Sequence, residues 1–249
     1  MDKKRIKTEL LIHDLKNPLA VIEAGIHALI HREEKYGPLT EKHLKALHRT
    51  LRNAKIAKGL VNDILEVGRS TEGIIDRNRC LFYEFIKSPL LEVFDLTDHN
   101  TAERIKECPD LSKLKAVLSD KDILLNMNER LWSEEVCLDV RKMRQILRNL
   151  MSNALKYREK TIELDIEKEA GTIFLSVTDD GEGIRKSFHK KIFECYFQLE
   201  EEREHCLRGH GLGLAGVLIL VEDMGGEMSL ESDKGKGAKF SVRIPLGGS

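Results

Sequence analysis

Four short stretches of the sequence combine residue types and spacings that could do chemistry. The first, HDLKNPL, places the imidazole of His13 beside the carboxylate of Asp14, and the amide of Asn17 follows one helical turn later on nearly the same face. An imidazole beside an acid suits an activated nitrogen nucleophile, because the carboxylate accepts the proton that the attacking ring must lose. An ordinary solvated surface histidine fits the same residues.

The second stretch, RNLMSNALKY, is amphipathic at helical spacing. Asn149 and Asn153 lie one turn apart, and Lys156 and Tyr157 follow about one turn later, so one face of the helix is polar and rich in donors. Amide oxygens suit Mg²⁺ that is shared with phosphates, and an ammonium group suits a phosphate. An ordinary amphipathic helix is the alternative interpretation.

The other two stretches are rich in glycine. DDGEGI places Asp179 at the end of an alternating strand, where its carboxylate can accept from an exocyclic amine, while Gly181 and Gly183 let the backbone approach a flat ligand. A simple hairpin turn is the alternative. RGHGLGLAGV opens a helix with three glycines, which favours a phosphate site, but it is neither a dinucleotide fingerprint nor a P-loop.

An N-terminal helical hairpin is expected to carry the first stretch. A heptad stripe predicts one long helix over residues 5–35, Gly37 and Pro38 stop it, and Thr40 is a plausible N-cap for a second helix. A short break between two long helices makes them antiparallel. The hairpin has a second apolar flank, and two helices alone form too small a core to bury it. We therefore expect two copies to form a four-helix bundle. The stripe consists of Ile12, Leu15, Leu19, Ile22, Ile26 and Leu29.

The remaining stretches fall in a mixed C-terminal region. A hinge at Gly68–Gly73 separates predicted domains 1–70 and 71–249. Asp139 is a good N-cap for the helix that carries the paired asparagines. Strands that pair as hairpins rather than as β-α-β repeats indicate an α+β sandwich. The expected elements are a helix near 81–95, a polar connection around 99–101, strands 123–127, 162–166 and 173–177, a helix over 212–224, and a hairpin of 228–231 with 239–244.

Composition excludes several classes. The 41 basic and 42 acidic residues argue against a general nucleic-acid binder, although residues 1–70 are basic, with 14 basic against 9 acidic side chains. Five cysteines without a C-x-x-C pair favour reduced thiols and a cytoplasmic location. No apolar run reaches the roughly 18 residues that a membrane helix needs, so we expect no membrane segment.

Taken together and in order, the motifs resemble the catalytic core of bacterial two-component sensor histidine kinases. The matching stretches are HDLKNPL, NLMSNALKY, DDGEGI, IFECYFQ (residues 192–198) and GHGLGLA, and the resemblance spans residues 10–245 except for about 74–130. It implies an N-terminal all-α antiparallel helical hairpin that forms a dimeric four-helix bundle. A C-terminal α+β (α/β sandwich) ATP-binding domain of the gyrase type would follow it.

The resemblance also implies roles for individual residues. His13 would be phosphorylated with help from Asp14, and Asn17 would assist hydrolysis of the regulator's aspartyl phosphate. Asn153 would hold Mg²⁺ through the ATP phosphates, and Asp179 would bind the adenine amine. The other nucleotide-binding candidates are Asn149, Lys156, Tyr157, Gly181, Gly183, Ile184, Arg208, Gly209, His210, Gly211, Leu212 and Gly213, with residues 194–210 as a lid.

The function that the resemblance implies is an ATP-dependent protein-histidine kinase. It would use ATP and Mg²⁺, act as a homodimer, pass the phosphoryl group from His13 to an aspartate of a response-regulator receiver domain, and act as a phosphatase toward that regulator. A gyrase-type ATPase or a serine kinase of the same fold is one alternative, which the His13–Asp14 pair disfavours. A nucleotide-binding scaffold is another, which Asn153, Asp179 and the glycine set disfavour.

Overall fold

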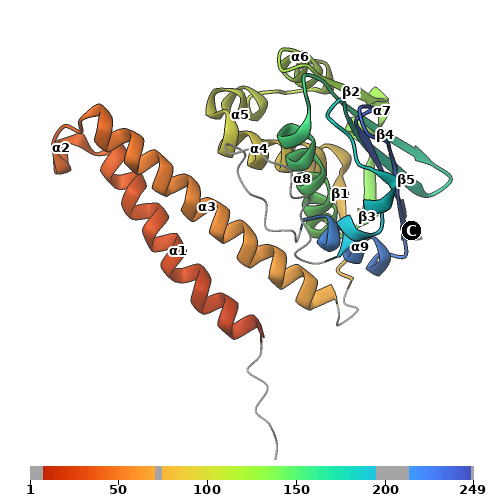
Figure 1. Cartoon of the computed structure of the whole chain (residues 1–249), viewed down its shortest axis with the longest axis horizontal. Coiled ribbons are helices and arrows are strands. Elements are labelled where there is room, and N and C mark those ends of the chain that lie inside the picture. Colours follow the sequence, from red (N-terminus) through yellow and green to blue (C-terminus); the bar gives the residue numbers. More distant parts are fainter. Residues whose placement is uncertain (1–7, 71–74, 195–212, 248–249) are drawn as a thin grey trace, which may run out of the picture. The chain divides into compact units, whose positions relative to one another are not determined.

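The computed structural model of the chain divides into two compact units, Met1–Thr71 and Glu72–Ser249 (Figure 1). The structure describes residues 8–70, 75–194 and 213–247. Within these ranges it leaves the side chains of residues 8–14, 56, 60 and 62–70 undescribed. Each unit is taken by itself below.

The first unit is a helical hairpin. Helix α1 spans Thr8–His31, the short α2 spans Glu33–Tyr36, and α3 spans Glu41–Ser70. The single helix predicted over 5–35 is interrupted, because Arg32 leaves the helical backbone with φ −118° and ψ 60°. Thr40 caps α3 as predicted, since its Oγ1 accepts from the backbone N–H of His43 at 3.2 Å.

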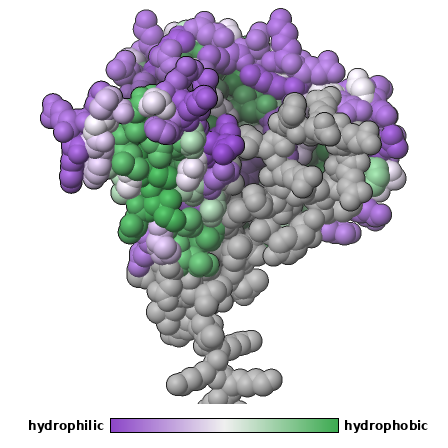
Figure 2. Space-filling view, turned by 60° about the vertical axis from the view of Figure 1, so that its left-hand side comes forward, coloured by the Kyte–Doolittle hydropathy of each residue, from purple (hydrophilic) through white to green (hydrophobic). Residues whose placement is uncertain are grey.

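This hairpin buries few of its apolar side chains. Ile26 and Ala54 are the buried apolar residues described in the unit, and an ion pair of 2.8 Å joins Lys58 to Glu23 across the two helices. Leu15 and Ile22, two members of the predicted stripe, are 46% and 45% exposed. Figure 2 shows an apolar band running down the hairpin between hydrophilic side chains. One copy of the hairpin therefore leaves an apolar face in water.

The second unit is built on a five-stranded sheet with the order β2-β4-β5-β7-β6. The β4–β5 and β6–β7 hairpins are present as predicted, and side-chain burial alternates along β4, β6 and β7, whereas in β5 the buried Ser176 interrupts the alternation. A separate antiparallel pair joins β1 to β3. The bounds are β1 Asn78–Leu81, β2 Ile123–Met127, β3 Glu135–Leu138, β4 Ile162–Glu169, β5 Thr172–Asp179, β6 Glu227–Ser232 and β7 Ala238–Pro245.

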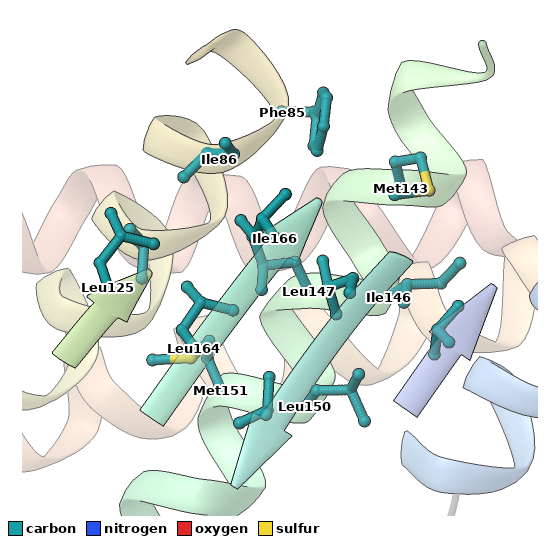
Figure 3. Packing of buried hydrophobic residues seen from close by; sticks show 14 of the residues in the cluster. Phe85, Ile86, Leu125, Met143, Ile146, Leu147, Leu150, Met151, Leu164 and Ile166 are labelled. Atoms are coloured by element: carbon teal, nitrogen blue, oxygen red, sulfur yellow. The ribbon is translucent and has the colours of Figure 1, made fainter. Parts of the chain in front are cut away.

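Three helices form the layer that carries the core: α4 (Phe82–Thr97), α8 (Val140–Tyr157) and α9 (Gly213–Asp223). Figure 3 shows apolar side chains of α8 meeting those of β4 and α4, with Leu150 near the sheet and Phe85 on α4. Asp139 caps α8 as predicted, accepting from the N–H of Lys142. The opposite side chains of the strands, such as Glu163 of β4, point to water.

Two expectations for this unit are wrong. The polar connection around 99–101 is helix α5 (His99–Lys106), and it is followed by α6 (Leu111–Ser119) and the short α7 (Glu129–Trp132). The strands also do not pair only as hairpins, because β2 lies parallel to β4 and the chain returns to it through α8. Two 3₁₀ turns, Lys186–Phe188 and Lys191–Phe193, follow β5.

Candidate functional site

Asp179 is the last residue of β5, and its carboxylate is buried, with 7% of the residue exposed. Its Oδ1 accepts from the backbone N–H of Gly181 at 3.0 Å. Burial raises the pKa of this carboxyl, and the N–H of Gly181 offsets only part of that rise. The fold thus holds a carboxylate where charge is disfavoured, at the strand end that the sequence singled out.

The glycines after Asp179 are required by contacts inside the fold. A Cβ on Gly181 would lie 2.1 Å from the carbonyl oxygen of Tyr157, and one on Gly183 would lie 2.0 Å from that of Asp233. Gly183 also has a φ of +72°. Gly237, which lies between β6 and β7, belongs with them, since its Cβ would lie 1.9 Å from the carbonyl oxygen of Asp179. These close approaches bring the ends of α8, β5 and the β6–β7 turn together.

Asp180 was not singled out from the sequence, yet it ties the end of β5 to the chain that follows α8. Its carboxylate accepts from the backbone N–H groups of Glu159, Lys160 and Thr161 at 2.8–3.0 Å, and from the Thr161 hydroxyl at 2.8 Å. Burial would raise the pKa of Asp180, but these donors lower it to about 2. The signal available in the sequence was a second acid beside Asp179 before a glycine.

The polar face of α8 is present as predicted. Asn149 is buried and its Nδ2 donates to the carbonyl oxygen of Gly213 at 3.4 Å, so it meets the start of α9. Asn153 is half-buried one turn later. At the exposed end of the helix the Lys156 ammonium donates to the Tyr157 hydroxyl at 2.9 Å and lies 4.7 Å from its ring centroid.

These contacts gather most of the described candidates into one region. Gly181 touches the end of α8 through Tyr157, and Asn149 touches Gly213. Ile184 donates its N–H to the Ser232 hydroxyl at 2.8 Å, which donates in turn to the carbonyl of Gly237. The candidates Arg208, Gly209, His210, Gly211 and Leu212 and the lid over 194–210 lie outside the described residues, apart from Glu194.

The candidates in the hairpin lie on α1. His13 and Asp14 fall within the helix, and their side chains are outside the described set. Asn17 is exposed one turn later, and Pro18 sits inside the same helix. Among the side chains that the structure describes, no group of three or more His, Cys, Asp or Glu could hold a metal ion. No described helix has the length and hydropathy to cross a membrane.

Two protein families match the chain in the order that the motifs predict. The His Kinase A (phospho-acceptor) domain matches residues 11–73, and the Histidine kinase-, DNA gyrase B-, and HSP90-like ATPase family matches residues 138–248. The two matches correspond to the helical hairpin and to most of the second unit. The chain therefore belongs to the two-component sensor histidine kinases and contains their catalytic core.

Individual relatives agree with this assignment. The sensor histidine kinase YkoH of Bacillus subtilis is 28% identical over 98% of this chain and 48% of its own length. The circadian input-output histidine kinase CikA of Synechococcus elongatus is 31% identical over 94% of this chain and 29% of its own. The crystal structure of full-length ShkA in complex with AMPPNP has the same fold, with a TM-score of 0.64 and 23% identity, over 98% of this chain and 46% of that one. The chain spans less than half the length of these relatives.

Proposed function

We propose that this chain is an ATP-dependent protein-histidine kinase core that phosphorylates its own His13. The observation that carries the nucleotide part is the buried Asp179 carboxylate, which sits at the end of β5 within a backbone cradle. A buried acceptor of this kind selects a ligand that donates a hydrogen bond, as the adenine amine does. The relative ShkA was crystallised with AMPPNP, an ATP analogue, which agrees with this choice.

The described residues suit the phosphate end of ATP as well. Asn153 presents an amide one turn beyond Asn149, and Lys156 supplies a cation on the same helix. Amide oxygen is a hard ligand that suits Mg²⁺ held jointly with phosphates, so Asn153 is the proposed protein contact of the metal. When bound, Mg²⁺ would neutralise charge on the phosphates.

The proposed chemistry is in-line phosphoryl transfer. A ring nitrogen of His13 attacks the γ-phosphorus, a nitrogen–phosphorus bond forms, and the bond to the ADP oxygen breaks. Asp14, the next residue in the chain, accepts the ring proton. The phosphoryl group then passes to an aspartate of a response-regulator receiver domain. The basic character of residues 1–70 suits such an acidic partner. Asn17 orients the water that later hydrolyses the aspartyl phosphate.

The hairpin is proposed to work as a dimer. The exposed apolar side chains of α1, among them Leu15 and Ile22, form the surface that a second copy would bury to complete a four-helix bundle. The proposed division of labour is therefore residues 1–70 for dimerisation and phosphate acceptance, and 71–249 for ATP binding.

Labelling with γ-labelled ATP tests this proposal. We expect the purified chain to take up label that is labile in acid and stable in alkali, as a phosphohistidine is. His13→Gln should take up no label while still binding ATP, because the nucleotide residues lie in the other unit. His27→Gln, an exposed histidine on the same helix, is the matched control and should be labelled like the parent. Acid-stable label would instead support a serine kinase, and ATP hydrolysis without label would support a gyrase-type ATPase.

A further inference from the structure

The polar face of α8 extends further than the two asparagines. Lys142 lies two turns before Asn149 on the same helical face, and only 3% of its side chain is exposed. Its ammonium forms an ion pair with Asp223, the last residue of α9, whose side chain is 12% exposed. A buried lysine is rare without a partner, because removing the charge from water is costly.

Helix α9 is thus held to α8 at both ends. Asn149 meets the first residue of α9, Gly213, and Lys142 meets the last, Asp223, so the two helices run antiparallel. Between these polar contacts the packing is apolar, with Val217 and Leu220 of α9 fully buried. Apolar contacts alone are non-directional and fix the axial position of a helix weakly. A buried ion pair fixes it more strongly, because a shift of one turn would separate the Lys142 ammonium from the Asp223 carboxylate at a cost in free energy.

We propose that Lys142 and Asp223 are positioning residues of the nucleotide site. Their ion pair fixes α9 along α8 and so holds the start of α9 at Asn149, one turn from Asn153. Neither residue touches the nucleotide. The inference rests on the proposed function, because the site that it positions is the proposed ATP site.

The test separates positioning from stability by replacing both charges with apolar groups. Replacing a buried ion pair with apolar residues of similar volume is often neutral or stabilising. We therefore expect the double variant Lys142→Met/Asp223→Leu to keep the unfolding temperature of the full-length parent. Its affinity for ATP with Mg²⁺, measured by calorimetric titration, should fall about tenfold. This is the fall expected when α9 occupies the position that permits ATP binding in only about one tenth of the molecules.

Two further variants act as controls. Lys142→Arg keeps the ion pair and should bind ATP like the parent. Lys168→Met/Glu134→Leu removes another partly buried ion pair, which joins β4 to the residue before β3 and includes no residue of α8 or α9, and should also bind ATP like the parent. Loss of affinity in this control would mean that any lost ion pair weakens binding, which would overturn the inference.

Unchanged ATP affinity in the folded Lys142→Met/Asp223→Leu variant would overturn the inference directly. If that variant does not fold, Asp223→Asn, which keeps the shape of the side chain and removes its charge, takes its place: weaker ATP binding supports positioning, and unchanged binding overturns it. Absence of ATP binding by the parent would refute the proposed function itself, so the two failures are distinguishable.

Discussion

The carboxylate of Asp179 illustrates a conflict between stability and binding at a single residue. Burial raises its pKa, so the ionised form that accepts most strongly from a ligand is the form that the folded unit disfavours. A carboxyl whose pKa is raised by folding lowers stability at any pH above its ordinary value, since the unfolded chain ionises it at no such cost.

Asp179→Asn should therefore stabilise the unit and weaken ATP binding at once. At pH 7 we expect a higher unfolding temperature without nucleotide, because each kcal/mol gained raises it by about 2–4 °C in a unit of this size. ATP affinity should fall about 10- to 100-fold, the scale of one hydrogen bond to a charged group. Thermal unfolding and calorimetry check both parts. The stability difference should vanish as the pH falls below the ordinary carboxyl value of 3.8. A destabilised variant that binds ATP normally would contradict the assignment.

Asp14 and Asn17 are expected to act in different reactions, Asp14 in the phosphorylation of His13 and Asn17 in the removal of phosphate from the regulator. Asp14→Asn should slow phosphorylation of His13 by about 10²–10⁴-fold, the usual scale for a general base. Asn17→Ala should keep much of the kinase reaction and lose phosphatase action, because a water needs orienting only in hydrolysis. Following the decay of phosphorylated regulator with each variant checks this. Parent-like removal of phosphate by Asn17→Ala would refute the proposed role.

Helix α5 shows at the scale of an element what local pattern could and could not predict. Its polar residues His99 and Asn100 conceal a helix that begins with a cap, since the Asp98 carboxylate accepts from the Thr101 N–H at 3.2 Å and from its hydroxyl at 2.8 Å. Lys121, beyond α6, adds an ion pair of 2.6 Å to Asp98. The sequence pattern of Asp98 and Thr101 is sufficient to predict the cap. The contact with Lys121 joins residues far apart in the chain, so local pattern could not predict it.

Removing this cap should loosen α5. We expect Asp98→Ala to lower the free energy of unfolding by about 1 kcal/mol at pH 7, the typical value of a lost N-cap. Hydrogen bonding by Lys121, followed by that of Thr101, lowers the pKa of Asp98 to about 2. The stabilisation should thus be complete above the ordinary value of 3.8 and disappear as the pH falls through 2. Urea titrations of both proteins across that range check this, with Asn100→Ala on the exposed first turn as the control.

The elements around the site were predictable where periodicity is strong. Alternation predicted β4 and β5, and the Asp139 cap with a 3.6-residue period predicted α8. Residues 123–127 were predicted as a strand and form β2, but its parallel partner was missed because pairing is decided by distant residues. The same holds at the site: Asp179 was identified, whereas the three successive N–H groups that bind Asp180 come from residues 159–161, about 20 positions away, and local pattern could not pair them.

At the scale of the whole molecule, the exposed apolar band of the hairpin predicts self-association. Ile22→Glu puts a charge into that band and should convert dimers to monomers, because burying an unpaired carboxylate is costly. Ala24→Glu, an exposed position on the opposite side of α1, should leave the dimer intact. Sedimentation velocity distinguishes the two states. A parent chain that sediments as a monomer at tens of micromolar, roughly the range of weak dimers, would refute the four-helix bundle.

The parallel pairing of β2 with β4 constrains the order in which the second unit can fold. The hairpin β4–β5 closes through a tight turn at Gly171, so its ends meet early. Strand β2 can pair with β4 only after the intervening chain, α8 included, has crossed the helical layer. Closing that long loop costs conformational entropy before the two strands make any stabilising contact. Strand β2, the first strand of the five-stranded sheet along the chain, is thus among the last to join it, and a nascent chain must emerge through Glu169 before all of β4 is available to pair with β2.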